Sequence, residues 1–208
     1  MLFRSPAGNA PMLAALAGGL PVEITRLGPI PDSLDALAIA FERARDADIV
    51  VTSGGASVGD HDLIRPALAH AGASIDFWRV AIKPGKPLLV ARRGSQTILG
   101  LPGNPASAFV TGFLFMLPLL RAALGAATPL AHPFAAVLTE ALAPGGKRME
   151  FLRARWSDGQ VTPEAEQDSG ALRPLANANA LICRAIGAPA VAIGDQVWIY
   201  WLENGGIA

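Results

Sequence analysis

Apolar and polar residues follow two different patterns along the chain. Between residues 10 and 124, segments with a helical spacing of apolar residues alternate with short apolar runs typical of buried strands. We expect helices over residues 12–17, 33–44, 64–71 and 105–124, and strands over 22–27, 48–52, 77–82, 87–91 and 97–100. This βαβ alternation predicts an α/β domain built on an open sheet that is covered on both faces.

The pattern changes after Gly125. Prolines at 129 and 133 interrupt the chain, and short alternating runs follow at residues 135–138, 151–156, 181–184 and 196–202. Such runs without helical spacing are typical of a small all-β module. We therefore expect a first, α/β domain over residues 1–127, which lacks a clear first strand, and a second, β domain over residues 131–208.

Composition excludes several classes of protein. With 51% hydrophobic and 16% charged residues, the chain is expected to be a soluble globular protein. The longest apolar segment, 108–124, contains Gly112, Pro118 and Arg121, so no membrane span is expected, and no secretory signal precedes it. A cytoplasmic location follows. Cys183 is expected to be a buried apolar residue, and 17 basic against 17 acidic side chains argue against a nucleic-acid partner.

Three glycine-rich loops carry the candidate chemistry, and each follows an apolar run. They are SGGASVGDHD (53–62), KPGKP (83–87) and GLPGNPAS (100–107). Glycines allow backbone N–H groups to approach a ligand closely, and Lys83 and Lys86 add positive charge in a turn restrained by prolines. The loop before Pro105 also leads into a helix whose N-terminus favours anions. The loops therefore predict an oxyanion or a phosphorylated ligand.

With these loops in this order, the chain resembles the C-terminal half of the molybdopterin molybdenumtransferase family, which includes the E domain of gephyrin. Weaker support comes from RMEFLR (148–153) and NANAL (177–181). The resemblance covers almost the whole chain. It implies a molybdopterin-binding α/β domain to about residue 127 and a barrel-like β domain after it.

The resemblance also implies roles for individual residues. The expected reaction takes adenylylated molybdopterin and molybdate, releases AMP and places molybdenum on the pterin. Molybdate would be held by Ser57, Lys83, Lys86, Pro87, Arg148 and Ser169, and the pterin pyrophosphate by Gly54, Gly55, Gly59, Gly103 and Asn104. Asp62 would be the catalytic residue for hydrolysis, holding Mg²⁺ together with Asp60. For Asp60, a hydrogen bond that stabilises the turn is an equally good explanation.

Two alternatives stay open from the sequence. Family members carry further domains before this point and form a homodimer whose protomers share the active cleft, so this chain could bind pterin, or serve as a scaffold, without turnover. The second alternative is the related molybdopterin adenylyltransferase, which is itself a candidate partner. Its loop is of the T-G-G-T-G type and it lacks the KPGKP turn, so Ser57, Lys83 and Lys86 argue against it.

Overall fold

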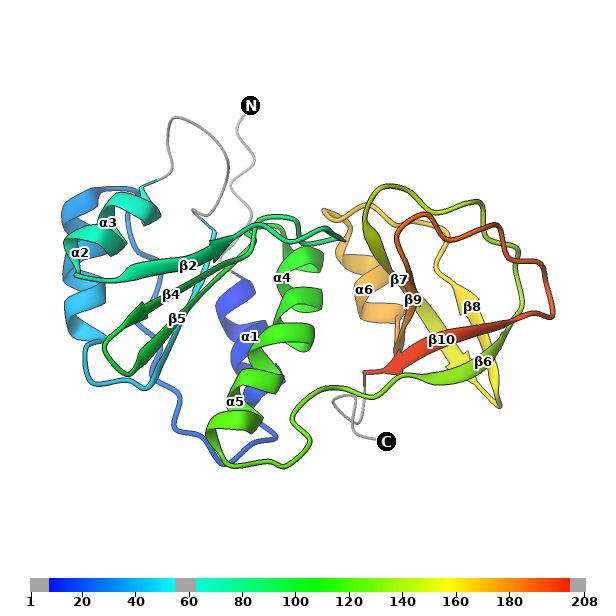
Figure 1. Cartoon of the computed structure of the whole chain (residues 1–208), viewed down its shortest axis with the longest axis horizontal. Helices are drawn as coiled ribbons and strands as arrows, with labels where there is room; N and C mark the ends of the chain where they lie inside the picture. The colour runs from blue at the N-terminus through cyan, green and yellow to red at the C-terminus, as the bar shows by residue number, and fades with distance from the viewer. Residues whose placement is uncertain (1–7, 55–62, 203–208) are drawn as a thin grey trace.

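The computed structural model describes residues 8–54 and 63–202 (Figure 1). The first unit contains, in chain order, α1 (Asn9–Ala17), α2 (Leu34–Arg43), β1 (Ile49–Ser53), α3 (Ile64–His70), β2 (Ser74–Trp78), β3 (Ile82–Lys83), β4 (Leu89–Arg93), β5 (Gln96–Leu101), α4 (Pro105–Thr111), a π-helical turn η1 (Gly112–Met116) and α5 (Leu117–Ala123). The second contains β6 (Phe134–Leu138), β7 (Met149–Ser157), β8 (Gln160–Pro163), α6 (Leu172–Asn177), β9 (Ala180–Arg184) and β10 (Gln196–Trp201).

The first sheet is mixed, with strand order β1-β5-β4-β2. Only β1 and β5 pair in parallel, whereas β4 pairs antiparallel with both β5 and β2. The βαβ pattern therefore predicted an open α/β sheet correctly but did not reveal the antiparallel hairpin of β4 and β5. A two-residue turn around Gly94 (φ 58°) joins these strands and is too short for a helical crossover.

Two predicted strands differ from the structure. Residues 22–27 have no regular secondary structure, because Ile24 is 44% exposed and, within residues 8–54 and 63–202, no strand pairs with this run. The run expected over 77–82 forms β2 earlier, from Ser74 to Trp78. Arg79 ends this strand because its φ of 85° departs from extended backbone.

Helices cover both faces of the first sheet, as expected. On one face, Phe41 of α2 and Leu68 of α3 pack against Ile98 of β5. On the other face, Leu13 of α1 and the helix that follows β5 pack against Leu99. Neighbouring residues of β5 therefore face opposite cores, which is the pattern of a strand buried on both sides.

A long helical stretch, Pro105–Ala123, lies between the first sheet and the second unit (Figure 1). It is long and apolar enough to cross a membrane by length and composition, yet 61% of its apolar window is buried inside the protein. It is the only such helix in the part of the chain that the structure describes. This burial is that of a core helix.

The second unit is a five-stranded barrel, which confirms the predicted barrel-like module. Its strands follow the order β7-β8-β6-β10-β9, and an additional β7–β9 pairing closes the ring. Leu138, Val161, Ile182 and Ile199 fill the interior. The short strand β3 of the first unit joins the same sheet, since it pairs in parallel with β7.

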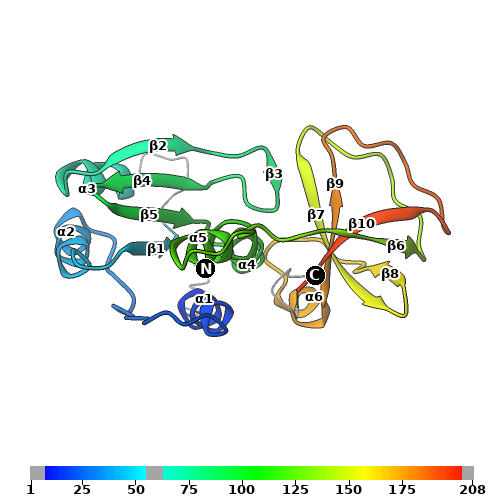
Figure 2. The same ribbon diagram turned by 60° about the horizontal axis from the view of Figure 1, so that its bottom comes forward.

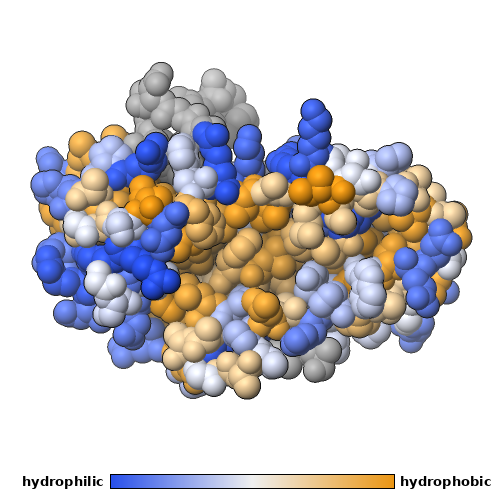
Figure 3. Space-filling view, viewed as in Figure 1, coloured by the Kyte–Doolittle hydropathy of each residue, from blue (hydrophilic) through white to orange (hydrophobic). Residues whose placement is uncertain are grey.

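The barrel packs directly on the long helix. Val110, Phe113 and Leu117 of the helix form one buried cluster with Phe151 and Leu181 of the barrel. Figure 3 shows apolar surface across the middle of this face of the molecule, where α4 and α5 lie between the sheet and the barrel. The two units therefore share an apolar interface in addition to the β3–β7 pairing.

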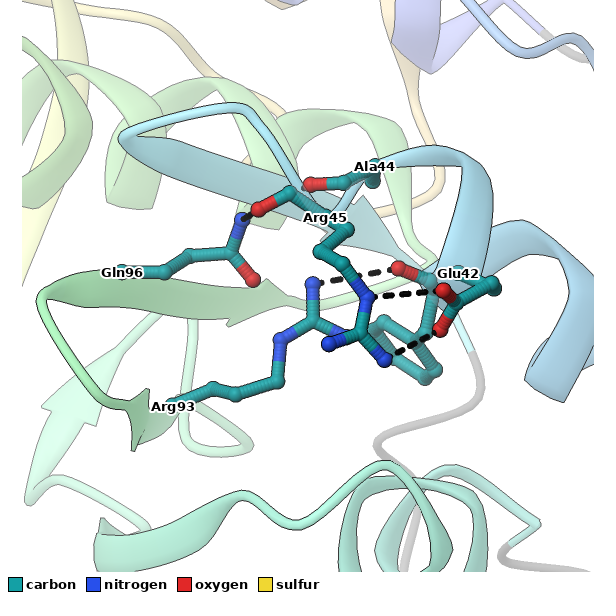
Figure 4. Close-up of polar contacts among 6 residues, drawn as sticks. Glu42, Ala44, Arg45, Arg93 and Gln96 are labelled. Atoms are coloured by element: carbon teal, nitrogen blue, oxygen red, sulfur yellow. Dashed lines mark hydrogen bonds and ion pairs between the residues drawn. The ribbon is translucent and has the colours of Figure 1, made fainter.

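Side chains of the β4–β5 hairpin also form hydrogen bonds at the C-terminal end of α2. Gln96 Nε2 donates to the carbonyls of Ala44 and Ala47 at 2.7 and 2.5 Å, and Arg93 Nη2 donates to the carbonyl of Phe41 at 3.1 Å. Figure 4 shows both side chains reaching the C-terminal end of the helix. Phe41 lies in the last turn of α2, and Ala44 and Ala47 lie in the turn that follows it, so the hairpin fixes the C-terminal end of α2 against the sheet.

Candidate functional site

Two of the predicted glycine loops meet at one edge of the first sheet. Because β1 and β5 run parallel, Ser53 and Leu101 end at the same edge. The Gly54 N–H donates to the carbonyl of Leu101 at 3.1 Å. A Cβ atom on Gly103 would lie 3.2 Å from Gly54 Cα, which is tighter than ordinary contact, and Gly54 has a φ of 90°. Backbone packs on backbone here, so both positions favour glycine.

Asn9, at the start of α1, links these two loops. Its Nδ2 atom donates to Ser53 Oγ and to the carbonyl of Gly103, both at 2.8 Å. Ser53 Oγ donates in turn to the carbonyl of Pro102 at 3.1 Å. One side chain from α1 thereby fixes the relative position of the loops that follow β1 and β5.

The N-terminus of α4 lies beside these loops. Asn104 is the N-cap residue and Pro105 the first helical residue, as the sequence predicted, but the Asn104 side chain makes no capping hydrogen bond. Its buried Oδ1 atom has no hydrogen-bond partner among the described residues. The Ala106 N–H, one of the free donors expected here, instead donates to the carbonyl of Ser169 at 3.3 Å. Ser169 of the barrel unit therefore lies at this helix terminus through its backbone.

Buried polar contacts hold the segment that contains Ser169. Arg153, only 1% exposed, donates through Nη2 to the carbonyls of Glu166 and Asp168 at 3.1 and 3.0 Å. Burial lowers the pKa of Arg153, and the charges of Asp168, Glu166 and Glu164 oppose this shift. The Gly170 N–H donates to Asp168 Oδ1 at 2.6 Å. The segment is therefore anchored to β7 where it meets α4.

The third predicted loop, residues 83–87, is called the lysine turn below. It begins within β3, where Ile82 and Lys83 pair with Met149 and Glu150 of β7. Figure 2 shows β3 reaching from the first sheet toward the barrel. Gly85 has a φ of 113°, and a Cβ atom there would lie 2.5 Å from the Thr111 side chain of α4. The lysine turn is therefore fixed between β7 and α4.

The basic side chains near this turn have different surroundings. Lys83 Nζ lies 3.6 Å from Glu150 Oε1, and its side chain is 48% exposed. Arg148 Nη1 donates to the carbonyl of Ile82 at 3.5 Å, a long contact. Lys86 is exposed and has no carboxylate within ion-pair distance in the described ranges. Lys83 and Arg148 therefore each have a contact that restrains them, whereas Lys86 is exposed on the same turn as Lys83.

The structure brings the predicted site residues into two groups along α4. The first lies at the helix N-terminus and contains Gly54, Gly103, Asn104 and Ser169. The second lies around the lysine turn and contains Lys83, Lys86, Pro87 and Arg148. Asn104 and Thr111 mark the two levels on the helix, and at 1.5 Å per residue they are about 10 Å apart along its axis.

The other predicted site residues lie outside the described residues: Gly55, Ser57, Gly59, Asp60 and Asp62. Within residues 8–54 and 63–202, no group of three or more histidine, cysteine, aspartate or glutamate side chains could hold a metal ion. The two residues expected to hold Mg²⁺, Asp60 and Asp62, are among those outside the described ranges.

Sequence reasoning did not identify three residues that shape the site, namely Asn9, Glu150 and Arg153. Asn9 lies three residues before the predicted first helix (12–17), but in the structure it is the first residue of α1, directly after the N-cap Gly8. Glu150 and Arg153 belong to RMEFLR, in which charged residues interrupt a strand at positions that turn out to be buried. A charged residue within a buried strand indicates a buried polar contact, because such a charge requires a partner.

Comparison with known families gives two matches. Residues 5–122 match a family model described as a probable molybdopterin binding domain, and residues 135–202 match the MoeA C-terminal region, domain IV.

Similar full-length proteins extend this result. The chain is 34% identical to molybdopterin molybdenumtransferase 2 of Mycobacterium tuberculosis over 201 residues, covering 92% of this chain and 49% of that protein. It is 32% identical to molybdopterin molybdenumtransferase of Staphylococcus aureus over 202 residues, covering 94% and 48%. The chain thus spans about half the length of these relatives.

Solved structures have the same fold. A molybdopterin biosynthesis moeA protein from Pyrococcus horikosii superimposes with a TM-score of 0.78 at 26% identity, covering 92% of this chain and 46% of that one. A molybdenum cofactor biosynthesis protein from Pyrococcus furiosus gives a TM-score of 0.74 at 24% identity, covering 92% and 63%. The latter likeness concerns the fold alone.

Proposed function

Because the chain belongs to the molybdopterin molybdenumtransferase family, we propose that it binds adenylylated molybdopterin and molybdate and contributes to placing molybdate on the pterin with release of AMP. Membership of this family places the chain in molybdenum cofactor biosynthesis, and its substrates and reaction are what we propose.

The observation that carries this proposal is the position of the lysine turn. Gly85 packs against α4, β3 pairs with β7, and the Arg148 side chain reaches the Ile82 carbonyl. Lys83 and Lys86 of the first unit and Arg148 of the second therefore lie on neighbouring segments of the chain. A doubly charged oxyanion such as molybdate suits this arrangement, because ionic hydrogen bonds to an anion are stronger than neutral ones.

We assign the two groups of residues to different parts of the proposed substrates. Around the lysine turn, Lys83, Lys86 and Arg148 would supply charge to molybdate, with Pro87 shaping the turn. Ser57 and Ser169 belong to the same proposed set of molybdate ligands, Ser169 from the α4 N-terminus, where its carbonyl accepts from the Ala106 N–H. At the α4 N-terminus, Gly54, Gly55, Gly59, Gly103 and Asn104 would present backbone and amide donors to the pterin's phosphates. A separation of about 10 Å along the helix suits one extended ligand that reaches both levels.

Hydrolysis of the adenylate is assigned to Asp62 in this proposal, with Asp60 sharing Mg²⁺. When bound, the metal would neutralise pyrophosphate charge. A homodimer that completes the cleft, and the adenylyltransferase as a partner that delivers the substrate, belong to the same proposal. The match of residues 135–202 to the MoeA C-terminal region supports a molybdenumtransferase over the adenylyltransferase alternative.

Calorimetric titration of the 208-residue chain with sodium molybdate tests the binding step. We expect saturable binding that is lost in the Lys83→Ala/Lys86→Ala double variant. Arg92→Ala is the control for loss of positive charge, because Arg92 pairs with Asp76 on another part of the first sheet and is 65% exposed. Binding that survives the double variant, or that Arg92→Ala abolishes equally, would contradict the assignment.

A non-catalytic, pterin-binding role is the second candidate, because the chain spans only about half of its relatives' length. Incubation with adenylylated molybdopterin and molybdate separates the two candidates. AMP release supports the enzymatic role, whereas retention of the intact adenylate supports binding alone.

A further inference from the structure

A nearly buried carboxylate, Glu150, lies between two basic side chains of the second sheet. It is 9% exposed. Its Oε1 atom is 3.6 Å from Lys83 Nζ, and its Oε2 atom is 3.4 Å from Arg184 Nη1. Lys83 is the register partner of Glu150 across β3 and β7, and Arg184 is its partner across β7 and β9. The three charges therefore form a row across three adjacent strands.

The two ends of this row differ. Arg184 is 6% exposed, and its Nη2 atom donates to the carbonyl of Pro189 at 2.8 Å. A buried carboxylate requires a compensating partner, and Arg184 meets this need inside the barrel. Lys83 is half exposed and has Glu150 as its ion-pair partner. Arg184 therefore anchors Glu150, and Glu150 restrains the solvent-facing lysine.

We propose that Glu150 is a positioning residue that holds the Lys83 ammonium in place for an anionic ligand. The inference rests on the proposed function, in which the lysine turn binds an oxyanion. A lysine side chain loses considerable rotamer freedom when it becomes fixed on a ligand. Because Glu150 already restrains Lys83, less of that freedom is lost on binding. Lys86 has no such partner in the described part of the chain.

The negative charge of Glu150 acts in the opposite direction, since a nearby carboxylate repels an anion. Arg184 offsets this repulsion, because it lies as close to Glu150 as Lys83 does. The row as a whole therefore keeps one net positive charge. Positioning and repulsion predict opposite effects when the carboxylate is removed, which makes the inference testable.

The first test is calorimetric titration of the Glu150→Gln variant with molybdate. We expect affinity to fall about two- to tenfold, the range that corresponds to one newly immobilised side chain. Tighter binding would show that the carboxylate only repels the anion, and unchanged affinity would show that it does not act on Lys83. Either result overturns the inference. Asp76→Asn, which breaks the exposed ion pair with Arg92 at 2.9 Å, is the control and should leave affinity unchanged.

A second measurement needs no molybdate. Limited acylation followed by mass spectrometry gives the reactivity of Lys83 relative to Lys86 within one molecule. We expect Glu150→Gln to raise this ratio several-fold, because Lys83 loses its ion-pair partner. If wild-type protein binds no molybdate, the proposed function fails, yet the ratio still decides whether Glu150 restrains Lys83. A ratio that does not change overturns the inference.

The conservative variant Glu150→Asp covers the case in which Glu150→Gln does not fold. It keeps the charge that Arg184 requires but shortens the side chain by one methylene group. Because the shorter carboxylate reaches Lys83 less well, we expect a higher Lys83 ratio and a lower molybdate affinity than in the wild type. If Glu150→Asp matches the wild type in both measurements, the inference is wrong.

Discussion

At the residue scale, the two lysines of the turn are not equivalent even though the sequence presents them as a pair. Lys83 is ion-paired with Glu150, whereas Lys86 is exposed and free of such a partner in the described ranges. We expect Lys83→Ala and Lys86→Ala each to weaken molybdate binding by about 1.5–3 kcal/mol, the range of a charge-assisted contact. Calorimetric titration measures both. Unchanged affinity in both variants would remove the lysines from the site.

Asp62 carries the catalytic proposal. In a protein that contains all domains of the relatives, we expect Asp62→Asn to retain adenylylated molybdopterin but to release AMP at least about 10²-fold more slowly. The amide keeps the shape and removes the charge. A quenched-flow assay of AMP release tests this, with Asp60→Asn in parallel. Wild-type rates in Asp62→Asn would refute the assignment.

At Gly54, Gly103 and Gly85 the sequence indicated tight turns, and in the structure backbone or a side chain approaches each of them closely. That Gly54 and Gly103 hold the pterin pyrophosphate stays a prediction. Asn9 and Glu150 were missed because their roles depend on partners far away in the sequence, Gly103 and Lys83. No local pattern names such a partner.

At the scale of elements, the lysine turn is held by shape as well as charge. A Cβ atom on Gly85 would lie 2.5 Å from the Thr111 side chain and 3.2 Å from Ile82, and its φ of 113° is unfavourable for other residues. We expect Gly85→Ala to lower the free energy of unfolding by about 1–3 kcal/mol and to weaken molybdate binding. Urea denaturation and titration measure the two effects.

Gly187→Ala is the matched control for Gly85→Ala. Gly187 also has a positive φ, 66°, but a Cβ atom there meets no atom within 4 Å. We expect it to reduce stability by less, about 1 kcal/mol, and to leave molybdate affinity unchanged. Equal effects of the two variants would show that backbone strain alone explains the result.

Element prediction was most reliable where an apolar run is buried on both sides. The runs that became β1 and β5, and the helices that cover them, were predicted within a few residues. The run over 22–27 was misassigned because strand propensity without a pairing strand is not sufficient. The two-residue strand β3 was absorbed into a longer run, since its partner β7 belongs to the other unit.

At the scale of the whole molecule, the interface between barrel and long helix contains the single cysteine. Cys183 packs at the edge of the cluster that includes Phe113 and Phe151, and burial raises the pKa of its thiol. Because the thiolate is the reactive form, we expect iodoacetamide to alkylate native protein at pH 8.5 at least about tenfold more slowly than protein in urea. Mass spectrometry follows the reaction, and equal rates would contradict the packed interface.

The raised pKa of the Cys183 thiol also makes stability depend on pH. The thiol pKa is higher in the folded protein than in the unfolded chain, so the unfolded chain loses its thiol proton first as pH rises. The contribution of this group to stability is therefore fully present below the ordinary thiol pKa and is lost as pH increases through the folded-state value. Replacing Cys183 with serine should remove that part of the alkaline dependence of urea denaturation.

The pairing of β3 with β7 also bears on the order in which the protein is assembled during synthesis. Between β3 and β7 lie β4, β5, the long helix and the linker at residues 124–133. A long loop must therefore close before the two strands can pair. A nascent chain that has emerged as far as this linker contains every strand of the first sheet but has no β7. We therefore expect the lysine turn to reach its binding conformation only after the barrel has been translated. Until then, the first unit of the nascent chain should not bind an oxyanion.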